Sequence, residues 1–246
     1  MRHASLFLRS ALYVAIMIIA TMLWVWVCLL AAPFKYNTRY WVTSRWNVFA
    51  IWLAKHLCGI DYQVKGWDNL PDGPAVLLSK HQSAWETIFM IKGMPRPLVY
   101  VFKREILWIP FFGWGMALLR MIPINRSQGR NAFQQVVKQG RRRLADGQWI
   151  IMFPEGTRIP VGQKGKYKSG GTRLAIETNT AVVPIALNSG ECWPKNSFVK
   201  RPGVVTVSIG KPISPENHTP ETLMQEVENW IESEMRVISP HAYSAG

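Results

Sequence analysis

The chain has 246 residues, 12 of them Trp, and a formal net charge of +14, which is enough sequence for one α/β domain with an attachment. Its three cysteines, Cys28, Cys58 and Cys192, are scattered and form no Cys-X-X-Cys pair, so the pattern excludes a disulfide framework and a cysteine zinc site. Segment 216–236 is acidic, which makes the rest of the chain more basic still and predicts an anionic partner, either nucleic acid or a membrane. The many Trp residues favour the membrane, because Trp partitions to the membrane–water interface.

The first predicted element is the segment 10–34, which carries no charged residue and exceeds the ~20 residues needed to cross a bilayer. A cleaved signal peptide is the alternative, but its apolar core spans only ~7–15 residues. A second apolar stretch, 46–60, contains Lys55 and His56 and is too short and too polar to predict a membrane span. Because basic residues flank the first stretch on both sides, a full span and a hairpin that enters one leaflet stay open. We expect residues 1–60 to form membrane-attaching helices.

Residues 61–246 are expected to form the second domain. Short β-like runs recur with helical patterns between them, at 75–79, 98–102, 149–153, 181–187 and 204–209. Strands that alternate with helices predict an α/β fold, with a mixed, largely parallel sheet flanked by helices.

Two helices stand out in the second domain. In segment 131–144 apolar residues repeat at helical spacing, and basic residues occupy the other face. Segment 219–238 has Thr219 as a candidate N-cap, followed by Pro220 and an apolar stripe. Segment 158–171 is rich in Gly and Lys and is expected to be a loop.

The first chemical motif places His81 and Glu86 five positions apart, directly after the apolar run 75–79. Ligands of α/β proteins bind beyond the carboxyl ends of the strands. A helix that begins between the two residues would bring the carboxylate to one imidazole nitrogen and leave the other nitrogen to take a proton. The spacing alone also fits a structural histidine beside a helix-surface glutamate.

The second motif is Phe-Pro-Glu-Gly-Thr-Arg at 153–158, which ends another apolar run. Gly156 permits a positive φ or a close approach of the backbone to a ligand. Arg158 offers a fork of donors that matches phosphate, and Glu155 is expected to hold this arginine or to bond a substrate hydroxyl. By itself the segment also fits a plain strand followed by a turn.

Together, in this order and at this spacing, the two motifs resemble those of the glycerolipid acyltransferase family, and within it the bacterial 1-acylglycerol-3-phosphate acyltransferases. Segments 102–126 and 182–186 resemble two further blocks of that family, so the match covers roughly residues 60–215. The first sixty residues match only as a membrane-attaching helical region. The family more commonly has Asp at the position of Glu86, one methylene shorter.

The resemblance implies a role for each matching residue. His81 would be the general base on the acceptor hydroxyl, and Glu86 would orient it. Arg158 would bind the phosphate of the acceptor, and the neighbouring residues would complete the site. The expected substrate-binding residues are Lys103, Arg126, Glu155, Gly156, Thr157 and Arg158.

The implied reaction transfers a fatty acyl chain from acyl-CoA or acyl-ACP to the sn-2 hydroxyl of 1-acylglycerol 3-phosphate, which gives phosphatidate. No metal and no cofactor beyond this thioester co-substrate is expected. The expected partners are the acceptor lipid, acyl-CoA or acyl carrier protein, and an anionic membrane surface, with no nucleic acid. The expected location is the bacterial inner membrane, with the catalytic domain on the cytoplasmic side.

Three alternatives remain. The acceptor could be another lysophospholipid, glycerol 3-phosphate or a lyso-ornithine lipid. The chain could also be a catalytically silent lipid-binding protein. A nucleic-acid binder is a weaker alternative, because the chain has no recognisable nucleic-acid motif.

The aromatic cluster Trp108, Phe111, Phe112 and Trp114 fits either plain core or the lining of a lipid channel.

Overall fold

The computed structural model describes residues 2–125, 127 and 129–243. Its centre is a seven-stranded sheet in the order β1-β7-β6-β2-β5-β3-β4. The strands are β1 (Ile60–Lys65), β2 (Val76–Ser79), β3 (Leu98–Lys103), β4 (Ile122–Ile124), β5 (Trp149–Met152), β6 (Val182–Leu187) and β7 (Gly203–Ile209). Neighbouring strands are parallel except for β6 and β7, which run antiparallel. The predicted mixed, largely parallel sheet is confirmed.

The predicted strands match five of these to within about one residue at each end, and β1 and β4 were missed. β1 has the sequence Ile-Asp-Tyr-Gln-Val-Lys and lies at one edge of the sheet, where polar residues are tolerated. β4 has three residues, one of them Pro123, and lies at the other edge. Both are too short or too polar to give the continuous apolar run that marks a buried parallel strand.

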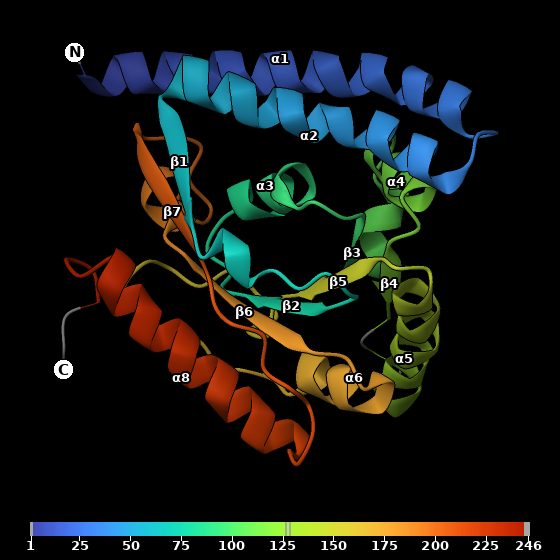
Figure 1. Ribbon diagram of the computed structural model, residues 1–246. Helices are drawn as coiled ribbons and strands as arrows, with labels where there is room; N and C mark the ends of the chain where they lie inside the picture. The colour runs from blue at the N-terminus through green and yellow to red at the C-terminus, as the bar shows by residue number, and fades with distance from the viewer. Residues whose placement is uncertain (1, 126, 128, 244–246) are drawn as a thin grey trace.

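Helices cover both faces of the sheet (Figure 1). On one face lie α2 (Tyr36–Cys58) and α3 (Trp85–Gly93), and on the other lie α5 (Gly129–Ala145), α6 (Gly170–Thr178) and α8 (Pro220–Ile238). The shorter helices are η1 (Trp67–Asn69), η2 (Arg104–Trp108), α4 (Phe112–Leu118) and α7 (Ser189–Cys192). The predicted helix 131–144 corresponds to α5. Thr219 caps α8 as predicted, because its hydroxyl accepts the backbone N–H of Thr222.

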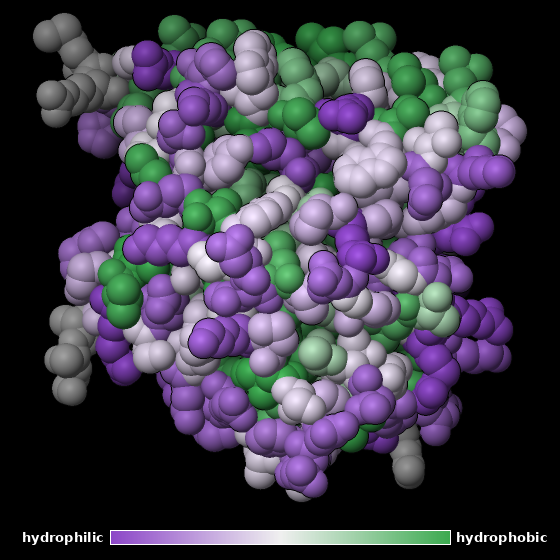
Figure 2. Space-filling view, in the orientation of Figure 1, coloured by the Kyte–Doolittle hydropathy of each residue, from purple (hydrophilic) through white to green (hydrophobic). Residues whose placement is uncertain are grey.

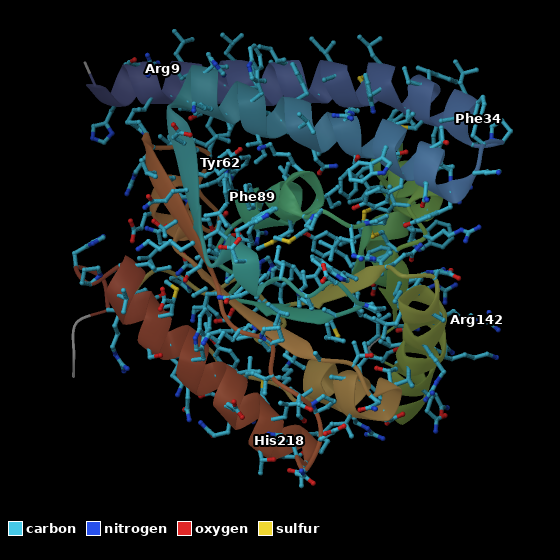
Figure 3. All side chains as sticks on the ribbon, in the orientation of Figure 1. Arg9, Phe34, Tyr62, Phe89, Arg142 and His218 are labelled. Atoms are coloured by element: carbon cyan, nitrogen blue, oxygen red, sulfur yellow. The ribbon has the colours of Figure 1, made fainter. Side chains whose placement is uncertain are left out.

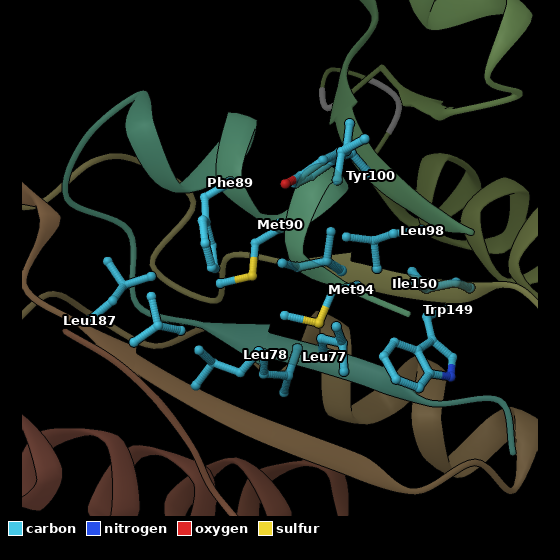
Figure 4. Packing of buried hydrophobic residues seen from close by; sticks show 14 of the residues in the cluster. Leu77, Leu78, Phe89, Met90, Met94, Leu98, Tyr100, Trp149, Ile150 and Leu187 are labelled. Carbon is cyan, nitrogen blue, oxygen red and sulfur yellow. The ribbon is translucent and has the colours of Figure 1, made fainter. Parts of the chain in front are cut away.

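The core lies between α3 and the central strands (Figure 4). Phe89 and Met90 of α3 lie on the face of the sheet that holds Leu77 of β2 and Trp149 of β5, and all four belong to one buried cluster. Each such side chain stabilises the fold by about 1.5–3 kcal/mol. Both ends of segment 80–84, which joins β2 to α3, are therefore anchored in well-packed elements.

The first helix, α1 (Arg2–Ala31), turns back at residues 32–35 and runs antiparallel to α2 along the domain (Figure 1). In Figure 3, Arg9 and Phe34 mark the two ends of this hairpin. Near its start the hairpin touches the domain, where the Ser10 hydroxyl accepts the backbone N–H of Lys200 at 2.9 Å and Tyr13 packs edge-on against Trp193. The structure thus shows α1 and α2 as an antiparallel pair, and the choice between a full span and entry into one leaflet stays a prediction.

One face of α1 is apolar and uncovered. Leu8, Leu23 and Leu30 are 68%, 65% and 76% exposed, and Figure 2 shows hydrophobic residues gathered along the upper edge of the molecule, over α1. Segment His3–Ala31 is long and apolar enough to cross a membrane, by length and composition. The division of the chain at residue 60 stays a prediction, and α2 shares the core of the sheet through Tyr40 and Ala54, both fully buried.

Candidate active site

His81 lies just beyond the carboxyl end of β2, a central strand between β5 and β6. The strand pairing continues one residue past β2, because the backbone N–H of Lys80 donates to Ile185 at 2.9 Å. The chain then turns, and the Ser83 hydroxyl accepts the backbone N–H of Trp85, where α3 begins. The helix therefore starts between His81 and Glu86, as the spacing predicts.

The imidazole of His81 and the carboxylate of Glu86 are hydrogen-bonded, with Nδ1 and Oε1 2.8 Å apart. An ionised carboxylate only accepts hydrogen bonds, so Nδ1 donates and Nε2 is left with its lone pair. The His81 ring stacks on Phe153, with centroids 3.9 Å apart and planes at 15°, and its side chain is 16% exposed. The ring is thus fixed in place, with a free basic nitrogen.

Glu86 is fully buried and is held by four further donors. Its Oε1 accepts the backbone N–H groups of Gln82 and Ser83, and its Oε2 accepts the hydroxyls of Ser83 and Ser189. Burial alone would raise the pKa of Glu86, but the hydrogen bonds and the charge of His81 outweigh it and place this pKa below its ordinary value. Glu86 therefore stays an anion that can stabilise an imidazolium.

Ser189 was not among the predicted site residues. Its hydroxyl lies 2.6 Å from Oε2 of Glu86, and it follows β6 in the same way that His81 follows β2. The signal was available in the sequence, because polar Asn188 and Ser189 follow directly on the apolar run 181–187.

Glu155 points into the protein. Its Oε2 accepts the backbone N–H of His81 at 2.8 Å, and its Oε1 lies 2.8 Å from Nζ of Lys80, whose side chain is fully buried. The carboxylate thus holds the chain at His81 from behind. The expectation that it holds Arg158 is wrong, because its two oxygens contact His81 and Lys80 instead, and its predicted role in binding the acceptor stays a prediction.

Gly156 has a φ of +69°, a value that favours glycine, and it lines the cavity in front of His81. The next residue, Thr157, is exposed, Arg158 is half-buried, and neither of these two predicted residues lines the cavity. The Arg158 guanidinium forms no hydrogen bond or ion pair with any residue that the structure describes. The backbone N–H of Ile159 donates to the carbonyl of His81 at 2.8 Å, which ties this segment to the catalytic strand end.

Two lysines line the same cavity. Lys103 ends β3 and lies 3.5 Å from Glu105, in an exposed pair that leaves it accessible. Lys168 was not predicted. Its backbone N–H donates to the carbonyl of Pro154, which holds it beside the second motif. The predicted Arg126 lies outside the residues that the structure describes.

The cavity has a volume of about 670 Å³ and extends from His81 to the N-terminal hairpin. Its walls are mostly apolar, and they include Trp24 of α1, Trp46 of α2, Ile88 of α3 and Phe112 of α4. Such dimensions are typical of a site for a small organic ligand, for which about 300–1,000 Å³ is usual.

The aromatic cluster of Trp108, Phe111, Phe112 and Trp114 divides between this cavity and the surface. Phe111 and Phe112 line the cavity, whereas Trp108 and Trp114 are 77% and 44% exposed.

The described residues contain no cluster of three or more His, Cys, Asp or Glu side chains that would hold a metal ion.

Comparisons with known proteins agree with this geometry. A family model described as "Acyltransferase" matches residues 61–188. The chain is 44% identical to the 1-acyl-sn-glycerol-3-phosphate acyltransferase of Pseudomonas aeruginosa over 95% of this chain and 92% of that one. It is 31% identical to the chloroplastic enzyme LPAT1 of Arabidopsis thaliana over 75% of this chain, and it spans about half of that protein (51%).

Among solved structures, the chain matches the 1-acyl-sn-glycerophosphate acyltransferase PlsC of Thermotoga maritima with a TM-score of 0.82. The match covers 96% of this chain and 97% of that chain at 20% identity, which shows a shared fold. The family model matches the part of the chain that holds His81, Glu86 and the motif at 153–158, and the relative from Pseudomonas covers nearly the whole chain. On these grounds the chain belongs to the acyltransferase family.

Proposed function

We propose that the protein transfers a fatty acyl chain from acyl-CoA or acyl-ACP to the sn-2 hydroxyl of 1-acylglycerol 3-phosphate, forming phosphatidate. The observation that carries this proposal is the fixed pair of His81 and Glu86 beside an apolar cavity with lysines in its wall. The names of the relatives from Pseudomonas and Arabidopsis support the same acceptor.

The chemistry needs one general base. Nε2 of His81 takes the proton of the acceptor hydroxyl while the hydroxyl oxygen attacks the thioester carbonyl, and Glu86 stabilises the imidazolium that forms. When the tetrahedral intermediate collapses, the C–S bond breaks, and the proton on His81 passes to the departing sulfur. The products are the new ester and the free thiol, and His81 is neutral again.

Lysines in the wall of the cavity that His81 lines suit a phosphate monoester. Arg158 has no described partner, and Lys103 and Lys168 line the cavity. We assign the acceptor phosphate to these three, with Arg158 as the bidentate ligand. Arg126 belongs to the same proposal from its place in the sequence.

The apolar walls suit an acyl chain. Because the walls include Trp24 and Trp46 of the hairpin, a lipid that reaches His81 lies against the same helices that carry the exposed apolar face. We propose that the hairpin enters one leaflet, the cytoplasmic one of the bacterial inner membrane. This placement keeps the soluble thioester donor and the lipid acceptor on the same side as His81.

Acyl transfer by the purified full-length protein tests the proposal. Radiolabelled acyl-CoA, and separately acyl-ACP, are offered with 1-acylglycerol 3-phosphate, glycerol 3-phosphate, lysophosphatidylcholine and a lyso-ornithine lipid. Phosphatidate as the dominant product, absent with His81→Ala, is the expected result. Turnover of only a neutral or zwitterionic acceptor would overturn the assigned acceptor, and folded protein without any product would favour the lipid-binding alternative.

A further inference from the structure

Lys80 is a fully buried lysine between two carboxylates. Its Nζ lies 2.8 Å from Oε1 of Glu155 and 2.7 Å from Oε1 of Glu232 on α8. Burial alone would lower the pKa of Lys80, but the two carboxylates outweigh it and raise this pKa above its ordinary value. The lysine is therefore a cation, and it joins the end of β2 to α8 through Glu232, which lies 152 residues further along the chain.

Each of the two carboxylates has a second partner. Glu155 accepts the backbone N–H of His81, and Glu232 accepts the hydroxyl of Tyr167 at 2.7 Å. Lys80 itself donates to the carbonyl of Gln163 at 3.4 Å. The four side chains of Lys80, Glu155, Tyr167 and Glu232, which we call the Lys80 network, thus join α8 to the loop 158–169 and to the backbone of His81.

The loop 158–169 carries two of the three described cations that we assign to the acceptor phosphate, Arg158 at its start and Lys168 near its end. Its ends are fastened by backbone bonds, from Ile159 to His81 and from Lys168 to Pro154. Its middle is fastened by side chains of the Lys80 network, through Gln163 and Tyr167. Glu232 is the member of the network that lies outside residues 61–188, the part matched by the family model.

Buried ion pairs are a costly way to stabilise a fold, because desolvation offsets much of the attraction between the charges. An apolar residue at position 232 would suit the apolar stripe of α8 equally well, since Ile231 and Met235 beside it are fully buried. A carboxylate at this position does what an apolar residue cannot do, which is to hold Lys80 and Tyr167 in fixed directions.

We propose that Glu232 is a positioning residue for the acyl transfer. Through Lys80 and Tyr167 it sets the loop 158–169, and through Lys80 and Glu155 it sets the backbone of His81. The kinetic part of this inference rests on the proposed function, because it takes the loop as the ligand of the acceptor phosphate. The part that concerns the order of the loop does not depend on the acceptor.

The test compares Glu232→Gln with Glu228→Gln in the full-length protein. Glu228 is one helical turn earlier on α8 and also binds the loop, through a 2.6 Å contact with Lys164, but that lysine side chain is 58% exposed. The matched pair therefore separates the buried network from a surface ion pair, which is worth about 0–1 kcal/mol. Tyr167→Phe is the milder variant, because it removes one hydroxyl and keeps every charge.

Amide hydrogen exchange without substrate gives the first readout. We expect Glu232→Gln and Tyr167→Phe to speed exchange in peptides that cover 159–168 by about tenfold, with β2 and β5 unchanged, as local opening predicts. Glu228→Gln should leave these peptides as in the wild type. If Glu232→Gln does not fold, the exchange of the same loop peptides in Tyr167→Phe tests the proposal. Unchanged exchange with Tyr167→Phe, or equal effects of Glu228→Gln, would overturn the proposal.

Kinetics gives the second readout. Misplacement by about 1 Å can cost about 10²-fold in rate, so we expect Glu232→Gln to lower kcat/KM for lysophosphatidate by about tenfold to a hundredfold. The KM for the thioester should stay within about twofold, because the thioester does not depend on the loop cations. A purely structural role would instead lower the yield of active enzyme and leave both KM values unchanged, which would contradict the proposal. A wild type without lysophosphatidate turnover would reject the proposed function, while the exchange data would still test the network.

Discussion

Nδ1 of His81 and Oε1 of Glu86 meet at 2.8 Å although Glu is one methylene longer than the Asp that is commoner in the family. The extra length is accommodated because α3 begins at Trp85, so Glu86 stands in the first turn and folds back over the segment that precedes the helix. Backbone N–H groups of Gln82 and Ser83 hold the same oxygen. The longer side chain is therefore fully engaged at this position.

The first prediction concerns this pair. Glu86→Gln keeps the shape but removes the charge that stabilises the imidazolium, so we expect kcat to fall by about 10²–10⁴-fold. Glu86→Asp keeps the charge but has a shorter side chain, so we expect kcat to fall by about tenfold, which is less than the fall for Glu86→Gln. The measurement is kcat for phosphatidate formation at saturating substrates, with circular dichroism to show that both variants fold. Equal losses would mean that orientation by the charge is not the role of Glu86.

The second prediction concerns stability as a function of pH. The pKa of Glu86 lies below its ordinary value of 4.5, so the folded state binds the proton more weakly than the unfolded chain does. The resulting stabilisation is fully present above pH 4.5 and is lost as the pH falls below it towards the folded-state pKa. We expect the Tm advantage of wild type over Glu86→Gln to shrink as the pH falls from about 5 to about 3. A constant difference across this range would contradict the assigned shift.

How much of this site the sequence predicts depends on how far apart its parts lie. His81 and Glu86 lie only five positions apart, so a helix that begins between them predicts their contact, although the spacing alone also fits a structural histidine. The buried parallel strands were found because they are continuous apolar runs, whereas β1 and β4 at the two edges give no such signal.

Long-range partners were missed for a different reason. Ser189 reaches Glu86 from 103 residues away, and its place after an apolar run marks it as a strand-end residue but does not identify Glu86 as its partner. From the sequence, Glu155 is interpreted as a ligand of the substrate. Its partners in the structure are Lys80 and the backbone N–H of His81, which the pairing of β2 with β5 brings to it and which no local pattern predicts. Tertiary placement decides which charged groups stay free for a ligand.

The third prediction concerns the phosphate ligands. Charge-assisted hydrogen bonds are worth about 1.5–3 kcal/mol, so Arg158→Ala should raise the KM for lysophosphatidate by about 10–100-fold. Lys168→Ala should act in the same direction with a smaller effect, because a lysine makes no bidentate contact. The KM for the thioester should change by less than about threefold in both. Lys166→Ala is the control, since Lys166 is an exposed cation of the same loop that is not assigned to the phosphate.

Equal rises in both KM values after Arg158→Ala would place the phosphate elsewhere. A rise confined to the thioester would assign Arg158 to the donor instead. Either result would leave the roles of His81 and Glu86 untouched, because those are tested through kcat.

The last prediction concerns the membrane face of the hairpin. Leu23 on α1 is 65% exposed and Val237 on α8 is 64% exposed, but the two helices lie on opposite sides of the sheet (Figure 1). A lysine placed in the hydrocarbon costs about 2.5–3.5 kcal/mol at the centre of a membrane helix and less near the interface. We therefore expect Leu23→Lys to weaken binding to anionic vesicles by about tenfold or more, measured by flotation, whereas Val237→Lys should bind as the wild type does. Because the two positions are about equally exposed, a difference between the variants does not come from solvation of the free protein. Loss of binding with Val237→Lys alone would contradict the prediction and show that α8, not α1, faces the bilayer.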